Sequence, residues 1–308
     1  MTDQQKGAFF AFLSYAIWGV FPLFWKLLEH VTSMEILLGR VIWSCVFTTI
    51  FIVIIGQRKK LIADVCYLWK HKRQFFSLMA AAFFISINWY IYIWAVTHDR
   101  VLESSMGYYI NPILSVVFGM IFFKEKVNFV NIMGIVFSLI GIVMVAMAKG
   151  ELGENFIWGI ILLLIAVLSE VGHASITKSL SGNYSSQIIV MYQFLIGSVY
   201  LLPTFILKGL DDFDAEVYFS AEVWYPIICL AVLCSSLAFS LWVSTIKNLG
   251  VAKSGIFSAL IPVAAALIAW MLGHEYLNSR QWIGIVISTI GVIMSQYTVS
   301  RKNQVKSC

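Results

Sequence analysis

Ten long apolar stretches run through this chain of 308 residues, and they leave it few ways to fold. Each is about 20 residues long, the length that a helix needs to cross the ~30 Å hydrocarbon core of a bilayer. The composition agrees, with 60% hydrophobic and 12% charged residues. The stretches are residues 7–28, 33–55, 75–96, 102–123, 128–148, 156–179, 185–207, 224–246, 251–273 and 278–299.

The apolar residues run continuously and do not alternate at every second position, so the pattern favours helices over the strands of a membrane barrel. The fold class that we predict is an all-α polytopic membrane protein with ten transmembrane helices. The first stretch lacks a small-residue cleavage site, and we expect it to be retained as a span. The gaps at about 56–74 and 208–223 are too short for separate soluble domains, so function is expected between the helices.

The basic residues predict the orientation. With both termini in the cytoplasm, fifteen lysines and arginines fall on the inner side and five on the outer side. This asymmetry is the positive-inside signal of a protein in the inner, or plasma, membrane, and it explains the net charge of +5 without a nucleic-acid partner. The five outer residues are Lys26, Arg100, Lys149, Lys208 and Arg280.

The two halves of the chain repeat each other at an offset of 150 residues. Pro112 matches Pro262, Glu125 matches Glu275, and GIVFSLIGIVM at 134–144 matches GIVISTIGVIM at 284–294. We therefore predict two five-helix repeats, residues 7–148 and 156–299. Because five is odd, the second repeat enters the membrane from the opposite side. Such inverted repeats recur in secondary transporters, which bind substrate near the midplane between them.

The same residues carry a resemblance. P-x12-E followed by G-x6-G in both halves resembles the paired EamA domains of the drug/metabolite transporter superfamily. The opening SYAIWGVFPLFWK at 14–26, SINWYIYIWAV at 86–96 and SSMGYYINP at 104–112 are more specifically similar to the RarD group of permeases. The resemblance implies a polytopic inner-membrane permease of a group linked to chloramphenicol sensitivity. It names neither a substrate nor a coupling ion.

Arg40 is a candidate substrate-binding residue because charges are costly in lipid and those found within spans are usually functional. It lies in the outer half of the second span and could hold a substrate carboxylate. It could equally pair with an acid or with carbonyls at a helix end.

Polar and aromatic residues on the first, third and fourth spans are candidates to line a cavity. Asn88 and Tyr92 share one helical face with Trp89 adjacent, and Tyr108 lies on a stripe with Ser104 and Asn111. Trp18 of the first span could widen the same cavity. Hydrogen bonding between helices or the aromatic belt at the membrane surface would explain such residues as well.

Glu170 and His173 lie one turn apart on the sixth span. Such a pair could exchange a proton, since histidine titrates near neutral pH. The alternative is a buried, hydrogen-bonded pair that fixes packing.

The predicted function is a secondary transporter that moves a small metabolite or an amphiphilic, drug-like molecule by alternating access, with protons as candidate coupling ions. The alternative is a non-transporting assembly or sensor subunit. The spans contain no DxxxD, HExxH or GxSxG, so we predict no enzyme. The five cysteines show neither CxxC nor metal-ligand spacing, so no metal or cofactor is expected. The expected partners are a small-molecule substrate and the lipid bilayer, and the oligomeric state stays open.

Overall fold

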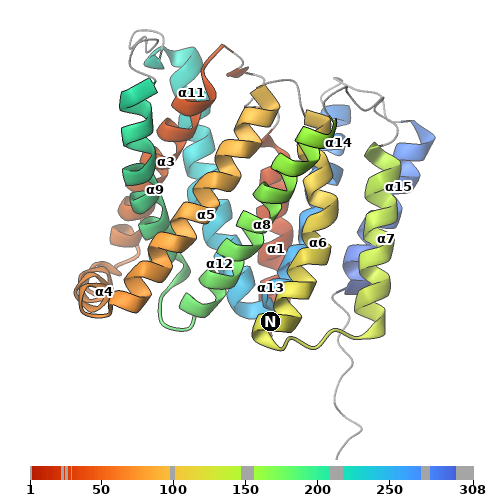
Figure 1. Ribbon diagram of the computed structural model, residues 1–308, viewed down its shortest axis with the longest axis horizontal. Helices are drawn as coiled ribbons and strands as arrows, with labels where there is room; N and C mark the ends of the chain where they lie inside the picture. Colours follow the sequence, from red (N-terminus) through yellow and green to blue (C-terminus); the bar gives the residue numbers. More distant parts are fainter. Residues whose placement is uncertain are drawn as a thin grey trace, which may run out of the picture.

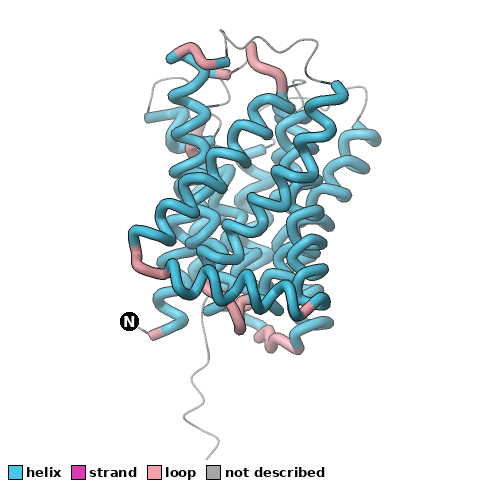
Figure 2. The backbone as a smooth tube through the Cα atoms, turned by 90° about the vertical axis from the view of Figure 1, so that its left-hand side faces the viewer, coloured by secondary structure: helices cyan, strands magenta, loops and turns pink. Residues whose placement is uncertain are grey.

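The computed structural model describes residues 2–21, 24, 27, 28, 30–97, 101–146, 156–208, 218–271 and 278–295, which form helices and turns without a strand among them (Figures 1 and 2). The helices are α1 (Asp3–Gly19), α3 (Ser33–Ile54), α4 (Arg58–Lys70), α5 (Lys72–Thr97), α6 (Val101–Phe123), α7 (Phe129–Ala146), α8 (Phe156–Leu180), α9 (Ser186–Lys208), α11 (Ala221–Cys229), η1 (Leu230–Leu237), α12 (Ala238–Leu249), α13 (Val251–Ile256), η2 (Phe257–Ala259), α14 (Leu260–Met271) and α15 (Ser279–Ser295). They stand side by side in one bundle, with the N-terminus at its lower end (Figure 1).

The prediction of an all-helical membrane protein is confirmed. By length and composition, four apolar helices of the described part could each cross a bilayer: Ser33–Ile54, Lys72–Trp94, Ser186–Pro203 and Ala221–Leu249. Shorter apolar helices cover Asn111–Phe123 and Phe129–Gly141. Large apolar side chains such as Ile54, Phe129 and Leu207 are exposed on the outside of the bundle, where lipid would cover them. The count of ten spans in two repeats stays a prediction.

Local capping explains where several helices begin. Thr32 and Glu35 form a capping box at the start of α3, with each side chain accepting from the backbone N–H of the other. Asn128 and Asn131 make the same reciprocal pair before α7. Asn278 and Gln281 form an equivalent pair before α15. Their positions are offset by 150 from those of Asn128 and Asn131.

Helices α7 and α15 pack closely at one side of the bundle (Figure 1). A Cβ atom on Gly134 would overlap the backbone of Ser295, and one on Gly141 would overlap the backbone of Ser288. The absence of a side chain at these glycines therefore allows the two helices to approach closely. The Ser138 hydroxyl lies 3.5 Å from the Ser288 carbonyl oxygen, so two residues offset by 150 meet at the centre of this contact.

Gly141→Val should destabilise the protein by about 1–3 kcal/mol, because a branched side chain has no room against α15. The measurement is thermal unfolding of the purified protein in detergent. Ile140→Val is the matched control, since Ile140 is 46% exposed on the outside of α7. Equal unfolding temperatures for the two variants would contradict the close contact.

Two irregular segments interrupt the helices of the second half. The helical run from Ala221 to Leu249 contains a π-helix, η1, in its middle. The run from Val251 to Met271 contains a 3-10 turn, η2, followed by Pro262 as the third residue of α14. In the first half, Pro112 lies inside the continuous helix α6. The sequence predicts the prolines within these helices but neither irregular segment.

Candidate functional site

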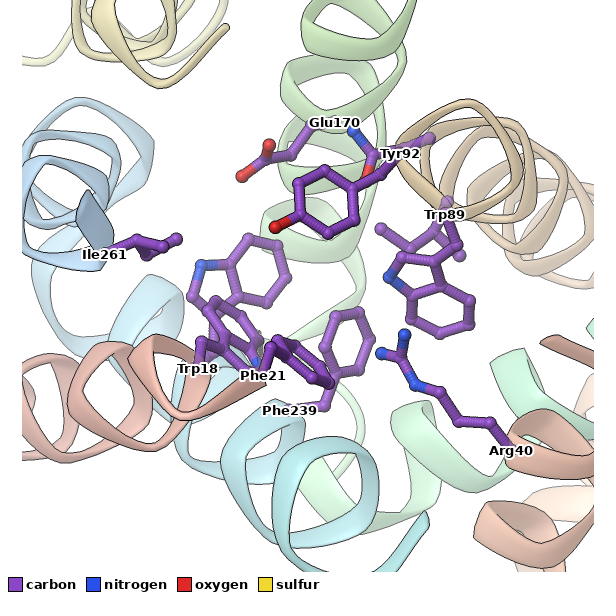
Figure 3. Close-up of a pocket in the computed structure, with 11 residues that line it drawn as sticks. Trp18, Phe21, Arg40, Trp89, Tyr92, Glu170, Phe239 and Ile261 are labelled. Atoms are coloured by element: carbon purple, nitrogen blue, oxygen red, sulfur yellow. The ribbon is translucent and has the colours of Figure 1, made fainter. Parts of the chain in front are cut away.

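A cavity lies in the middle of the bundle and is lined mainly by aromatic side chains (Figure 3). It leaves about 60 Å³ for the centres of water-sized molecules, and a single water needs about 10–15 Å³ by that measure, so the cavity has room for several waters. Its wall comes from both halves of the chain. The lining residues are Trp18, Phe21, Arg40, Ile85, Asn88, Trp89, Tyr92, Glu170, Phe239, Trp242 and Ile261.

Arg40 enters the cavity from α3 and is only 3% exposed. Its guanidinium carbon lies 4.8 Å from the ring centre of Phe21 and 4.7 Å from that of Trp89, so the cation stacks on two aromatic faces. Arg40 Nε donates to the Ser235 hydroxyl at 2.6 Å. The charge is therefore held in place by rings and by a polar group of η1.

The π-helix η1 supports this side of the cavity through backbone carbonyl groups that accept side-chain hydrogen bonds. Trp18 Nε1 donates to the Cys234 carbonyl at 2.8 Å, and the Ser44 hydroxyl donates to the Ala231 carbonyl at 3.2 Å. π-Helical turns within α-helices are frequent at functional sites because they redirect backbone and side-chain groups. Here the turn receives groups from α1 and α3 beside the cavity.

The aromatic wall is a set of mutually packed rings. The Phe239 ring stacks on that of Trp242 with centroids 5.2 Å apart, and Trp89 meets Phe239 edge-on at 5.4 Å. Trp18 packs against Trp242 at 6.2 Å. Such contacts fix the ring orientations and keep much of the cavity surface apolar.

Glu170 lies on the opposite side of the cavity from the Arg40 guanidinium (Figure 3). Its Oε1 accepts a hydrogen bond of 3.0 Å from Asn111 Nδ2. Glu170 also borders a smaller void of about 10 Å³, together with Tyr15, Ser115 and Ser254. The carboxyl group is therefore placed between the central cavity and a one-water space next to α13.

His173 does not line the cavity, although the sequence placed it beside Glu170. Its ring is fully buried and stacks on Phe239 at 5.5 Å and on Trp242 at 5.3 Å. Its Nε2 hydrogen bonds with the Thr177 hydroxyl at 3.1 Å. These contacts direct His173 into the aromatic wall, while those of Glu170 are directed toward Asn111.

Three of the predicted residues come from α5, as their helical spacing requires. Trp89 and Tyr92 border the cavity, and Asn88 borders it while donating to the Ala166 carbonyl of α8 at 2.9 Å. The Tyr108 side chain lies outside the described residues, as do Pro22 and the Ser104 side chain.

Six of the candidate residues named from the sequence thus border one cavity: Trp18, Arg40, Asn88, Trp89, Tyr92 and Glu170. Their role in binding a substrate stays a prediction. Sequence reasoning missed Phe239 and Trp242, because aromatic residues are frequent in membrane helices and a spacing of three residues does not show whether that face meets a cavity. It also missed the polar contribution of Ser235. Among the described residues, no cluster of three His, Cys, Asp or Glu side chains is arranged to hold a metal.

Two charged side chains bind the junction of α12 and α13 at the lower end of the bundle. Glu125 accepts from the Val251 N–H at 2.8 Å and from the Ala252 N–H at 2.9 Å. Lys178 Nζ donates to two carbonyls at the end of α12, at 3.0 Å each. Gly250 joins the helices with φ 89°, and Glu125 occupies the space that a Cβ there would need.

The fold and the site together define a multi-pass helical membrane protein with a central aromatic cavity between its halves. The sequence model of the EamA-like transporter family matches residues 5–147 and again residues 157–297. The chain therefore belongs to the EamA-like transporter family, within the drug/metabolite transporter superfamily and its RarD group. It is a membrane transporter of the drug/metabolite family.

Named relatives agree with this placement. The chain is 30% identical over 300 residues to the uncharacterized transporter YojE of Bacillus subtilis, covering 97% of this chain and 96% of that one. It is 32% identical over 157 residues, 49% of each chain, to the protein RarD of Escherichia coli. The chloramphenicol-sensitive protein RarD of Pseudomonas aeruginosa is 23% identical over 285 residues, 92% of this chain and 91% of that one.

A crystal structure of another protein shares the fold. It superimposes with a TM-score of 0.78 over 95% of this chain and 97% of that chain, at 14% sequence identity. A likeness at this identity supports the fold alone.

Proposed function

We propose that this protein is a secondary transporter of the inner, or plasma, membrane that moves a small metabolite or an amphiphilic, drug-like molecule through the cavity of Figure 3. The observation that carries the proposal is the cavity itself. It places one stacked cation, Arg40, and one carboxyl group, Glu170, on opposite sides of an aromatic space between the two halves. Mostly apolar walls with a few placed polar groups are typical of small-molecule sites.

Alternating access is the proposed mechanism. The sequence repeat, the matching caps before α7 and α15, and the Ser138–Ser288 contact all support two inverted five-helix repeats, residues 7–148 and 156–299. The cavity has room for waters, and we propose that the contact of Glu125 with the start of α13 keeps the lower end closed. Passage of a metabolite would then require helices to separate at one end and close at the other.

The distribution of basic residues supports an orientation with both termini in the cytoplasm. The lower end of the bundle in Figure 1, which carries the N-terminus, α4 and α13, would then face the cytoplasm. We further propose a proton as the coupling ion, with Glu170 as the group that binds it.

A metabolite-wide comparison tests the transport proposal. Medium and cell extracts of a deletion strain, a strain overproducing the parent and a strain overproducing Arg40→Ala are compared. We expect at least one compound whose distribution changes with the parent and not with the variant. The purified parent should then move that compound across proteoliposomes. A well-folded parent that changes no compound in cells would favour the assembly or sensor subunit.

We predict that the Glu125→Gln variant populates a conformation with an open lower end about tenfold more than the parent does. The amide lacks the charge that strengthens the bonds to the Val251 and Ala252 N–H groups, and a hydrogen bond to a charged group contributes ~1.5–3 kcal/mol. The reporter is Ala174→Cys, which borders the small void above the closure, in a background without native cysteines. Its rate of labelling by a membrane-impermeant thiol reagent in inside-out vesicles should rise about tenfold.

Lys126→Gln is the matched control, because Lys126 is an exposed neighbour of Glu125. This substitution also changes the local charge by one unit, in the opposite direction. Its labelling rate should stay at that of the parent. Equal labelling rates in the Glu125→Gln variant and the control would show that the hydrogen bonds of Glu125 do not keep the lower end closed.

A further inference from the structure

Helix α4 lies across the lower end of the bundle, seen end-on in Figure 1 and from the side at the lower front of Figure 2. Hydrogen bonds on either side of the helix fix its place. Before it, Gln57 Oε1 accepts from the Ser185 hydroxyl at 3.4 Å, and after it, Gln74 Oε1 accepts from the Tyr184 hydroxyl. The helix is therefore held in a defined position on the bundle.

Three sides of α4 differ in character. Leu61, Asp64 and Leu68 face the protein at a helical spacing of three and four residues, and Leu68 is 3% exposed. A neighbouring side carries Ile62 and Val65, with 55% and 48% of their surface exposed, together with the exposed Cys66. The remaining side carries the exposed Lys59 and Lys70.

The charge of this region is strongly positive. Six basic residues fall within positions 58–73, namely Arg58, Lys59, Lys60, Lys70, Lys72 and Arg73, and all six are exposed. Asp64 is the single acid of that segment and is turned partly into the protein, where burial raises the pKa of its carboxyl group against the opposing effect of Lys60. The exposed surface of this segment therefore carries six cations, against the one partly buried acid within positions 58–73.

Helix α4 thus has an exposed apolar strip between basic residues at both of its ends, and it lies across the end of a membrane bundle. These features are typical of a helix that lies in the membrane surface. We propose that α4 binds anionic phospholipids, with Arg58, Lys59 and Lys60 at the headgroup phosphates and with Ile62, Val65 and Cys66 against the upper acyl chains. The anionic leaflet attracts such basic segments and a zwitterionic one does not. Because α4 connects α3 to α5, bound lipid would restrain the helices that carry Arg40 and Trp89.

The first experiment measures lipid selectivity on the purified full-length protein. The protein is mixed with equimolar phosphatidylcholine and phosphatidylglycerol, and native mass spectrometry counts the lipids that stay bound. We expect the parent to retain phosphatidylglycerol preferentially and the triple variant Arg58→Gln/Lys59→Gln/Lys60→Gln to lose that preference, by about fivefold for each charge removed. The matched control is Lys6→Gln/Lys126→Gln/Lys247→Gln, which removes three exposed charges elsewhere from the same end of the bundle.

The control should keep the parent's preference. Unchanged retention in the α4 variant, or an equal loss in both variants, would overturn a lipid site on α4.

The second experiment locates the helix and needs no charge variant. An environment-sensitive fluorophore is attached to Cys66, with the other four cysteines replaced, and the protein is placed in nanodiscs containing phosphatidylglycerol. Lipids brominated in the upper acyl chain should quench the emission, and aqueous iodide should quench it weakly. Strong quenching by iodide together with none by brominated lipid would place Cys66 in water and overturn the proposal.

Discussion

Replacing Arg40 with alanine should lower the transport rate by about 100-fold or more while the protein still accumulates in the membrane. The substitution removes the cation that stacks between Phe21 and Trp89 and leaves the Ser235 hydroxyl without its donor. Desolvated cation–π contacts contribute up to ~2 kcal/mol each and a hydrogen bond from a charged group ~1.5–3 kcal/mol, so a loss of about 3 kcal/mol in the transport cycle lowers the rate about 100-fold. The measurement is flux of the transported compound into proteoliposomes.

Arg40→Lys separates binding from packing. Lysine keeps the charge but not the planar group that stacks on two rings, so we expect an intermediate rate with a raised KM if Arg40 holds a substrate anion. Val46→Ala is the control on α3, because Val46 is exposed on the outside of the bundle. Loss of membrane accumulation in Arg40→Ala, with normal flux for the molecules that remain, would assign Arg40 a structural role.

Glu170→Gln should abolish the dependence of transport on a pH gradient while leaving expression and substrate binding near those of the parent. Glutamine can still accept the hydrogen bond from Asn111, but it cannot take up or release a proton at neutral pH. The position of Glu170 between the central cavity and the small void gives a bound proton access to both. Flux is measured in proteoliposomes with and without an imposed gradient.

Glu222→Gln is the matched control, since Glu222 is an exposed acid in the first turn of α11. It should respond to the gradient as the parent does. A Glu170→Gln variant that also keeps this response would show that Glu170 is not the coupling group. Failure of that variant to accumulate would favour a structural hydrogen bond to Asn111.

The length of the apolar stretches was enough to place several helices within a residue or two. The predicted span 33–55 corresponds to α3, Ser33–Ile54, and the predicted span 185–207 to α9, Ser186–Lys208. Helix α4 was missed because its residues are too polar for a span and it is held by contacts with other segments. The π-helix η1 was missed because LAVLCSSL is a mostly apolar sequence that continues a predicted span. The hydrogen bonds from Ser44 and Trp18 to its carbonyls are visible only in three dimensions.

In the candidate site, too, some residues could be predicted from the sequence and others could not. Asn88 and Tyr92 could be found because polar side chains at a spacing of four stand out on an apolar helix. Phe239 could not, since aromatic residues are frequent in membrane helices and only packing shows which of them face a cavity. His173 was grouped with Glu170 because it lies one turn away, yet its ring stacks on Phe239 and Trp242 and does not line the cavity.

The access of the cavity to each side of the membrane tests the central claim most directly. Ile261→Cys, in a background without native cysteines, places a thiol on the cavity wall, and a membrane-impermeant reagent is applied to right-side-out and to inside-out vesicles. Alternating access predicts labelling from both sides, with transported substrate slowing both reactions. Labelling from one side only, whether or not substrate and a pH gradient are present, would contradict it.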